Sequence, residues 1–230
     1  MTRLTGQERA SYVQNMFTRI ARRYDLMNRL MTGGQDVRWR RQVIFLARLR
    51  PQARLLDLGT GTGDLAREAR SQFPRAKIIA ADFTLEMMRV GQKRGPLDFS
   101  SADALRLPFP DSSFDAVVSG FLMRNVIDLQ RALQEQYRVL RKGGRMVILD
   151  TTRPKKNLLS PLIWLHMHVV IPLLGRILTG SSDAYRYLPE TTEGFVTAEN
   201  LASRMAVAGF KKIGFERFMF GTIAIHSGEK

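Results

Sequence analysis

The sequence predicts an α/β fold whose mostly parallel, seven-stranded sheet ends in an antiparallel hairpin at one edge. Short apolar segments alternate with amphipathic segments over residues 53–150, which is typical of parallel strands joined by crossover helices. Two apolar segments near the end of the chain follow each other without a helix between them, which favours the hairpin. The chain has 230 residues, 44% of them hydrophobic and 25% charged, and so suits one globular domain with room for a subdomain.

Two helices are predicted ahead of the sheet. Apolar side chains recur at helical spacing over residues 11–31, and the arginines mostly avoid that stripe. A TGGQ sequence ends this helix, and a second helix covers residues 36–48. We therefore expect an N-terminal helical extension, residues 1–50, packed on a core domain of residues 51–230.

The core elements follow one another as alternating strands and helices. Short apolar segments predict strands, and longer amphipathic segments predict the helices between them. The predicted strands cover 53–58, 76–83, 98–104, 114–121, 143–150 and the two segments on either side of Gly221. The predicted helices cover 64–73, 84–94, 128–142 and 197–210, the last with Thr197 as its N-cap and Gly209 at its end.

An insertion of about residues 151–196 interrupts this pattern. Its segment NLLSPLIWLHMHVVIPLLG (157–175) has no formally charged residue and approaches the roughly 20 residues that span a bilayer. Pro161 and Pro172, together with the polar residues of the segment, argue against a transmembrane helix, which is the less favoured alternative. We expect instead a helical cap over the active site.

Composition limits the partners and the chemistry. The formal net charge is +15, and residues 1–50 hold 11 arginines and three acidic residues. This imbalance favours either a polyanionic partner, such as nucleic acid or an anionic membrane surface, or simply a solvated basic surface. The absence of cysteine excludes disulfides, thiolate metal sites and a cysteine nucleophile, and with three histidines we expect no metal site. The first residues lack the apolar core of a secretory signal, so we expect a cytoplasmic protein.

Three glycines in LLDLGTGTGDL (55–65) predict a cofactor site between the first strand and the first crossover helix. Dinucleotide sites use G-x-G-x-x-G, because the pyrophosphate rests on the helix N-terminus. Here Gly59, Gly61 and Gly63 give G-x-G-x-G, and Asp64 stands where the third dinucleotide glycine would be. A carboxylate there would repel a pyrophosphate but not a cation, so S-adenosylmethionine, with its sulfonium and ammonium groups, is the predicted cofactor.

Carboxylates at strand ends extend the same prediction. Asp57 completes D-x-G-x-G-x-G, the pattern of Class I methyltransferases, and thus predicts their Rossmann-like fold. Asp82 ends the second strand, where it could accept hydrogen bonds from the ribose hydroxyls. Asp103 ends the third strand, where it could accept from the adenine amino group, with Ala104 along the ring. The remaining residues expected to line the cofactor site are Thr62, Phe83 and Gly120.

Longer stretches resemble the UbiE-type family, the C-methyltransferases of ubiquinone and menaquinone biosynthesis. YDLMNRLMTGGQDVRW (24–39) is similar to the first signature of the family, and RVLRKGGRMVILDTT (138–152) to the second. ADALRLPFPDSSFD, MRNV and DAYRYLPET also resemble family stretches, so the similarity covers about residues 12–226. The resemblance implies methylation of a ring carbon of a prenylated quinol, either demethylmenaquinol, a demethoxyubiquinol precursor, or both.

This chemistry requires a phenolate held in line with the methyl donor. Arg124 and Asn125, just past the fourth strand, are the candidates for stabilising it. Asp64 is expected to face the methionine ammonium group, with a role as catalytic base as the alternative.

The remaining candidates are tyrosines and an asparagine outside the core. Tyr24 and Asn28 are expected to close over the cofactor or the ring, because the first helix must pack near the glycine loop. Tyr185 and Tyr187 are expected to belong to the cap.

A prenylated quinol resides in the bilayer, so its enzyme must reach a membrane. We expect peripheral association with the anionic inner face of the cytoplasmic membrane, where the arginine-rich N-terminal helices could meet anionic headgroups. The segment 157–175 could dock in the membrane or only line a channel for the tail and cap the site. A nucleic-acid partner is not expected, because aromatic residues do not interleave with the basic runs. The sequence leaves open whether two copies form a homodimer.

Three rival functions stay open at this point. The first is methylation of another lipid or phenolic acceptor, since fold and cofactor do not determine the substrate. The second is a basic nucleic-acid-binding module with a vestigial cofactor pocket, and the third is a dinucleotide oxidoreductase, which Asp64 disfavours. Methylation of cytosine C5 is excluded because it needs a cysteine, and SGFLMRNV replaces the Asn/Asp-Pro-Pro-aromatic motif of amino-methylating enzymes.

Overall fold

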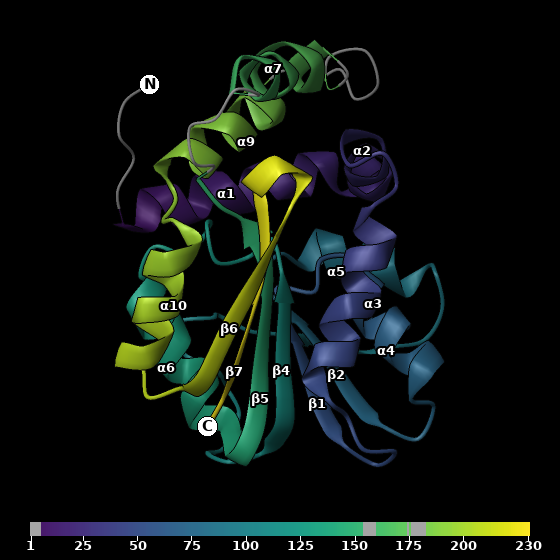
Figure 1. Cartoon of the computed structure of the whole chain (residues 1–230). Helices are drawn as coiled ribbons and strands as arrows, with labels where there is room; N and C mark the ends of the chain where they lie inside the picture. Colours follow the sequence, from purple (N-terminus) through teal and green to yellow (C-terminus); the bar gives the residue numbers. More distant parts are fainter. Residues whose placement is uncertain (1–5, 154–159, 174, 176–182) are drawn as a thin grey trace.

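A seven-stranded sheet with strand order β3-β2-β1-β4-β5-β7-β6 forms the centre of the molecule (Figure 1). The structure is a computed structural model that describes residues 6–153, 160–173, 175 and 183–230. The first five strands are parallel, and β7 pairs antiparallel with both β5 and β6, which confirms the predicted hairpin. The strands are β1 (Arg54–Leu58), β2 (Lys77–Asp82), β3 (Asp98–Ser101), β4 (Phe114–Gly120), β5 (Leu140–Thr151), β6 (Lys211–Phe218) and β7 (Ile223–Glu229).

Helices cover both faces of the sheet, as the crossover pattern predicted. One face carries α3 (Asp36–Ala47) and α4 (Asp64–Gln72), and the other carries α6 (Leu129–Val139) and α10 (Ala198–Val207) (Figure 1). Successive strand residues alternate between these two cores: Leu55 packs with the α3 side and Leu56 with the α6 side. The remaining crossover helix, α5 (Leu85–Gln92), joins β2 to β3.

The end of α6 differs from the sequence prediction, and the start of α10 confirms it. The helix predicted to reach residue 142 ends at Val139, because Leu140 already has extended backbone angles and pairs with Phe114 of β4. Thr197 is the predicted N-cap of α10, where its side chain accepts a hydrogen bond from the backbone N–H of Asn200 at 3.2 Å.

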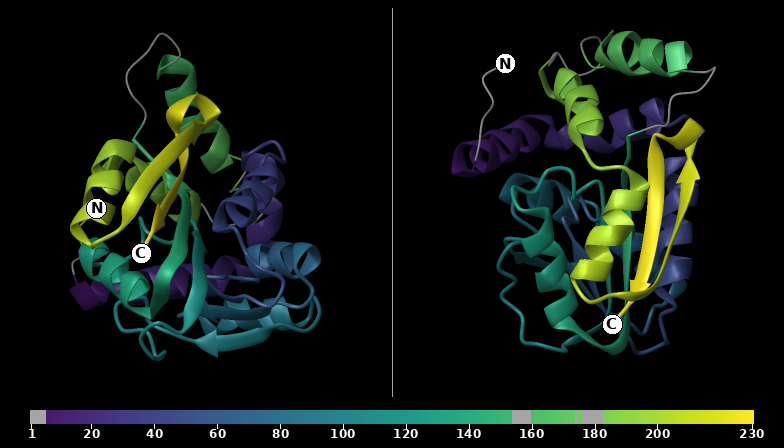
Figure 2. Two further views of the ribbon diagram at one scale, coloured as in Figure 1. Left: turned by 60° about the horizontal axis from the view of Figure 1, so that its bottom comes forward. Right: turned by 60° about the vertical axis from the view of Figure 1, so that its left-hand side comes forward.

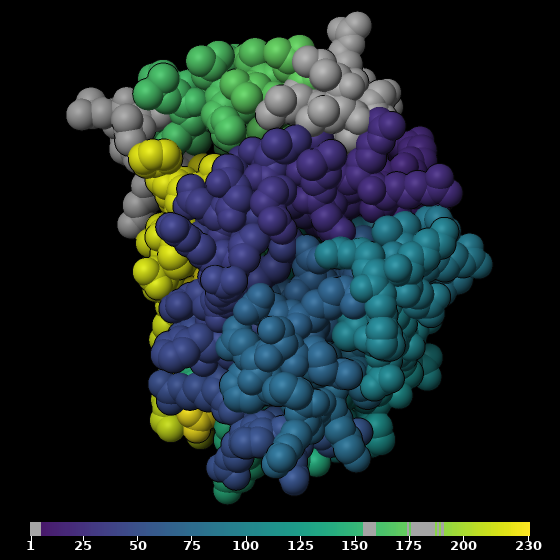
Figure 3. All heavy atoms as spheres, turned by 90° about the vertical axis from the view of Figure 1, so that its right-hand side faces the viewer, coloured from purple at the N-terminus to yellow at the C-terminus, as the bar shows by residue number. Residues whose placement is uncertain are grey.

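The single helix predicted over residues 11–31 is two helices. α1 (Gly6–Ile20) ends in a 3₁₀ turn, η1 (Ala21–Arg23), and α2 (Tyr24–Met31) follows it. The break allows apolar residues from both helices to enter one small core: Met16 of α1, Met27 of α2 and Ile171 of the cap pack in it. Tertiary packing therefore overrides a helical pattern that is continuous in the sequence. The N-terminal helices, in purple in Figure 3, lie between the α/β core and the cap.

The insertion forms the predicted helical cap. It contains α7 (Ser160–Leu165), a π-helical turn η2 (His166–Val170) and α9 (Asp183–Gly194), and it lies across α1 at the top of the molecule (Figure 2). Within the described residues, no helix combines the length and the apolar character that crossing a membrane would require. The division into an N-terminal extension, residues 1–50, and a core domain, residues 51–230, stays a prediction.

Glu135 of α6 holds the loop that follows β3. The side chain is 3% exposed and accepts hydrogen bonds from the backbone N–H of Leu107 at 2.8 Å and from Arg138 Nη2 at 2.9 Å. The Arg138 hydrogen bond is the main cause that lowers the pKa of Glu135 below its ordinary value. The carboxylate therefore anchors the segment just beyond Asp103 and Ala104 to α6.

We expect Glu135→Gln to lower the free energy of unfolding by about 1.5–3 kcal/mol at neutral pH, because charged hydrogen bonds are lost. The pKa is lower in the folded protein, so this contribution is complete above the ordinary value of 4.5 and is lost as the pH falls through the lowered pKa. Urea unfolding of both proteins at several pH values should show a difference that narrows in acid. Glu86→Gln, which removes only the exposed pair with Arg89, should cost at most about 0.5 kcal/mol. Equal costs for the two variants would contradict this role of Glu135.

Candidate active site

A first cavity lies over the carboxyl ends of β1, β2 and β4, the expected place for a ligand in an open α/β sheet. It brings together nine of the ten residues predicted to bind the cofactor: Asp57, Gly59, Gly61, Thr62, Asp82, Phe83, Asp103, Ala104 and Gly120. The tenth, Gly63, is the N-cap of α4 and is not among the lining residues. Residues of α1 and α2 close the cavity from above, including Gln14 and Tyr24.

Two glycines allow the loop to adopt its backbone conformation and to pack closely against neighbouring side chains. Gly59 and Gly61 have φ angles of +67° and +59°, in the left-handed region that favours glycine. A Cβ atom at Gly59 would lie 2.9 Å from Cδ1 of Leu122, and one at Gly61 would lie 3.1 Å from Cε of Met87. The loop is therefore a cradle that side chains at these positions would fill.

Asp57 lies at the bottom of this cradle and is fully buried. Its Oδ2 accepts hydrogen bonds from Thr60 Oγ1 at 2.5 Å and from the backbone N–H of Ala66 at 3.0 Å. Its Oδ1 has no partner among the described residues, and Asp57 lines the cavity. Burial raises the pKa of Asp57 to about 7. An unpartnered carboxylate oxygen at this depth favours a ligand that carries a positive charge.

Asp82 joins the end of β2 to the glycine loop. Its two carboxylate oxygens accept hydrogen bonds from the backbone N–H groups of Gly61 and Thr84, both at 2.7 Å. Burial raises the pKa of Asp82 above its ordinary value. Phe83, which is 43% exposed, and the exposed Asp103 contribute to the cavity from more open positions. These residues therefore line one cavity, and the part of a cofactor that each of them would contact stays a prediction.

Asp64 lies at the centre of a network of ion pairs. Its Oδ2 is 2.7 Å from Arg40 Nη1, and its Oδ1 is 2.8 Å from Arg94 Nη2. Arg94 also contacts Asp25 of α2 at 2.6 Å, and Thr62 Oγ1 donates to Asp25 at 2.8 Å. Both oxygens of Asp64 are therefore paired with arginines, which makes it a poor catalytic base and connects the N-terminal helices to the glycine loop.

Arg124 and Asn125 are held rigidly beyond β4. Arg124 is 8% exposed, and its Nη1 lies 2.7 Å from Asp150 Oδ1, while its Nε has no partner among the described residues. Asn125 donates from Nδ2 to the carbonyl oxygen of Phe121 at 2.9 Å and accepts at Oδ1 from the hydroxyl of Tyr187 at 3.3 Å. The structure thus brings Tyr187 of the cap to a candidate catalytic residue of the core.

Tyr24 and Asn28 of α2 stand between the two halves of the site. Both line the first cavity, and a hydrogen bond joins their side chains. Burial raises the pKa of Tyr24 above its ordinary value, and burial has the same effect on Tyr187, so both phenols are hydrogen-bond donors at neutral pH. The side chain of Tyr185 lies outside the described residues.

A second cavity adjoins the first and is lined mainly by apolar side chains. It forms between α2, the end of β5, the cap and the turn η3 (Met219–Gly221). Asn28 and Phe121 line both cavities, so the two meet there. Arg124 lines the second cavity and Asn125 the first. A methyl donor in the first cavity could therefore face an apolar acceptor in the second.

Sequence reasoning missed several residues of the site. Asp25 and Arg40 lie within or next to the stretch 24–39, whose resemblance to a family signature could have directed attention to them. Asp150 lies within the stretch 138–152, whose resemblance to the second family signature was a signal of the same kind. Arg94 carries no local signal, because its partners Asp25 and Asp64 lie far away in the chain. The second cavity was also missed, since its walls come from several distant segments.

Solved structures confirm the fold. An S-adenosylmethionine-dependent methyltransferase from Thermotoga maritima matches 94% of this chain and 99% of its own, with a TM-score of 0.64 and 23% identity. The [4+2]-cyclase SpnF matches 98% of this chain and 96% of its own, with a TM-score of 0.70 and 18% identity. Both likenesses bear on the architecture alone.

Curated relatives and a family model bear on identity. A protein of Desulfotalea psychrophila named ubiquinone/menaquinone biosynthesis C-methyltransferase UbiE is 46% identical over 95% of this chain and 90% of its own length. A demethylmenaquinone methyltransferase of Thermus thermophilus is 44% identical over 94% of this chain and its whole length. The model of the ubiE/COQ5 methyltransferase family matches residues 3–230. The chain belongs to the ubiE/COQ5 methyltransferase family.

Proposed function

We propose that the chain transfers a methyl group from S-adenosylmethionine to a ring carbon of a prenylated quinol, either demethylmenaquinol, a demethoxyubiquinol precursor or both, in respiratory quinone biosynthesis. The observation that carries the proposal is the meeting of a glycine-lined cavity and an apolar cavity at Asn28 and Phe121. The names of the two relatives support the same reaction and the same class of acceptor.

The first cavity fits S-adenosylmethionine, which is the methyl donor and supplies an electrophilic methyl group on a sulfonium when bound. Asp57 Oδ1 is free to attract the positively charged methionine part, and the glycine cradle has room for its close approach. We assign the ribose hydroxyls to Asp82 and the adenine to Asp103 and Ala104, with Thr62, Phe83 and Gly120 as further lining residues.

Arg124 is the residue that we assign to the reacting oxygen of the quinol. Loss of a hydroxyl proton gives a phenolate, and its neighbouring ring carbon then forms a bond to the methyl group as the carbon–sulfur bond breaks. The reacting carbon next loses its proton while the ring oxygen regains one, so that one proton is released overall. The guanidinium of Arg124 stays charged throughout, and its free Nε–H could hold the phenolate.

No side chain is assigned as the base. Asp64 is engaged by two arginines, and the raised pKa of Tyr24 keeps its phenol protonated. We propose that the phenolic proton passes to solvent while Asn125, fixed by Phe121 and Tyr187, helps to orient the ring. Alignment of this kind can contribute up to ~7–11 kcal/mol to lowering the barrier.

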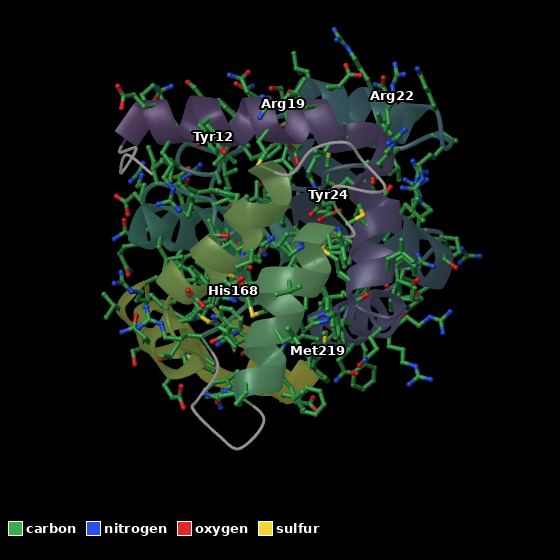
Figure 4. The ribbon with its side chains drawn as sticks, turned by 90° about the horizontal axis from the view of Figure 1, so that it is seen from above. Tyr12, Arg19, Arg22, Tyr24, His168 and Met219 are labelled. Carbon is green, nitrogen blue, oxygen red and sulfur yellow. The ribbon has the colours of Figure 1, made fainter. Side chains whose placement is uncertain are left out.

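The cap gives the second cavity an apolar exit. Six of its side chains are exposed and apolar: Leu162, Trp164, Leu165, Val169, Val170 and Leu173. Leu162 and the exposed Phe220 also line the second cavity, so a prenyl tail could pass from the cavity to this patch. Arg19 and Arg22 lie along the N-terminal helical segment in Figure 4, at the edge of the face that carries the cap. We propose that this face associates peripherally with the anionic inner face of the cytoplasmic membrane.

Two other functions are weaker candidates. Another lipid or phenolic acceptor could enter the same two cavities, and the acceptor assay below separates it from a quinol. A nucleic-acid-binding module with a vestigial pocket is disfavoured by a cradle that retains an unpartnered buried carboxylate. Homodimer formation stays a prediction.

We expect the protein to transfer labelled methyl groups from S-adenosylmethionine to short-chain demethylmenaquinol or demethoxyubiquinol, kept reduced. Arg124→Lys should lower kcat by about 10²–10³, because it removes the Nε donor but keeps a cation beside Asp150. Its affinity for S-adenosylmethionine in calorimetry should be unchanged. Arg75→Lys, at an exposed position on the loop before β2, is the matched control. Transfer to neither quinol by the wild type would refute the proposed acceptor.

Affinity for S-adenosylmethionine should weaken as the pH falls below about 7. The raised pKa means that Asp57 of the free protein gains a proton in this range, and a positively charged ligand binds the ionised form better. Calorimetry from about pH 8 to about pH 6 should show up to about a tenfold loss of affinity per pH unit below the pKa. The Asp57→Asn variant should bind S-adenosylmethionine weakly at every pH. The pH dependence that remains in its affinity should come from the titration of the ligand's own amine. Parallel pH profiles for the two proteins would argue against Asp57 as the anionic partner.

Flotation with anionic liposomes should recover the protein at low salt, and added salt should release it. Trp164→Ser should reduce recovery, because it removes a large apolar side chain from the exposed cap face. Val207→Ser, which removes an exposed apolar side chain from α10, should float like the wild type. If both variants float equally, the cap is not the docking surface.

A further inference from the structure

The second cavity holds polar atoms that have nothing to bind within the protein. The described residues contain 12 buried side-chain nitrogen or oxygen atoms without a hydrogen-bond partner, and four of them belong to residues that line this one cavity. They are Arg124 Nε, Thr151 Oγ1, His166 Nε2 and Thr192 Oγ1. A buried polar atom without a partner lowers stability, so such a concentration in an apolar wall indicates a ligand that carries oxygen atoms.

The threonines of the cavity fall into two kinds. Thr32 donates to the carbonyl oxygen of Asn28 at 2.8 Å, and Thr222 donates to that of Met219 at 2.8 Å, so both hydroxyls serve the fold. Thr151 and Thr192 are buried, at 7% and 1% exposed, yet their hydroxyls make no bond to the rest of the described chain. Their hydroxyls are therefore free to bind a ligand.

His166 approaches the same cavity from the cap. It begins the π-helical turn η2, a distortion that recurs at functional sites. His168, two residues later, has both ring nitrogens engaged, with Nδ1 3.1 Å from the carbonyl oxygen of Trp164 and Nε2 3.3 Å from Glu193. In Figure 4 the cap helix that carries His168 lies over the region between Tyr24 and Met219. His168 thus joins two parts of the cap to each other, whereas His166 Nε2 has no partner among the described residues.

We propose that Thr151, His166 and Thr192 bind the second hydroxyl of the acceptor, the one across the ring from the oxygen held by Arg124. This inference rests on the proposed function and adds a specificity to it: the enzyme selects rings that carry two hydroxyls over rings with one. A phenolic hydroxyl can accept from a threonine and bond to an imidazole nitrogen, so it satisfies groups that the fold leaves unpaired.

Two reduced acceptors test the proposal: a short-chain 2-prenyl-1,4-naphthoquinol, and the naphthol analogue that lacks the hydroxyl remote from the reacting carbon. The wild type should prefer the quinol in kcat/KM by about tenfold or more, which is the effect of one or two buried hydrogen bonds. Thr151→Val, Thr192→Val and His166→Phe should each lower kcat/KM for the quinol and leave the naphthol rate unchanged. His168→Phe is the matched control and should keep the wild-type preference.

Thermal unfolding provides a second readout that a structural role would not produce. Thr151→Val and Thr192→Val remove hydroxyls that have no partner, so their Tm should stay the same or rise, whereas Thr222→Val should lower Tm because it breaks a bond of the fold. Unchanged affinity for S-adenosylmethionine would verify that each variant is folded. Variants that keep the wild-type preference for the quinol would overturn the inference. Transfer to neither compound by the wild type would instead overturn the proposed function and this inference with it.

Discussion

The ion pairs around Asp64 are the interaction on which the rest of the site depends. Arg40 of α3 and Arg94 beyond α5 each take one carboxylate oxygen, and Arg94 also contacts Asp25 of α2. The glycine loop and the N-terminal helices therefore share one set of charges, in which loss of Arg94 would remove the ion pair that joins Asp25 to the others. Because α2 also carries Asn28, these pairs fix the point at which the two cavities meet.

The same ion pairs change the explanation of why the site prefers a positively charged cofactor. The sequence placed the preference for a cation at Asp64, which was correct about the cofactor and incomplete about the cause. Two arginines neutralise Asp64, so the unopposed negative charge belongs to Asp57, which is fully buried and has one free oxygen. Desolvation makes that carboxylate costly when it is ionised and alone, and a bound cation relieves the cost. A bound pyrophosphate would instead increase the cost of ionising Asp57.

Features that depend on neighbouring residues could be predicted, and features that depend on distant packing could not. Every strand was located from its apolar pattern, and the glycine loop was recognised because its chemistry lies within a few residues. The break between α1 and α2 was missed because it is imposed by the core with Ile171, far along the chain. Asp150 was missed as the partner of Arg124 for the same reason, since 26 positions separate them. The second cavity needs several segments at once, and no one of them signals it.

Arg124 shows how an apolar wall can contain a charge. Asp150 pairs with its Nη1 and with its backbone N–H, while Arg9 of α1 donates to its carbonyl oxygen at 2.9 Å. The guanidinium is thus placed before any acceptor arrives, and little reorganisation remains for the reaction itself. Its partners come from α1 and β5, and the cap closes the opposite wall through residues such as Met167. On the proposed mechanism, the low-dielectric surroundings that would strengthen the pull of Arg124 on a phenolate require the N-terminal helix and the cap to be seated together. Binding of the acceptor would then be coupled to the packing of two segments outside the sheet.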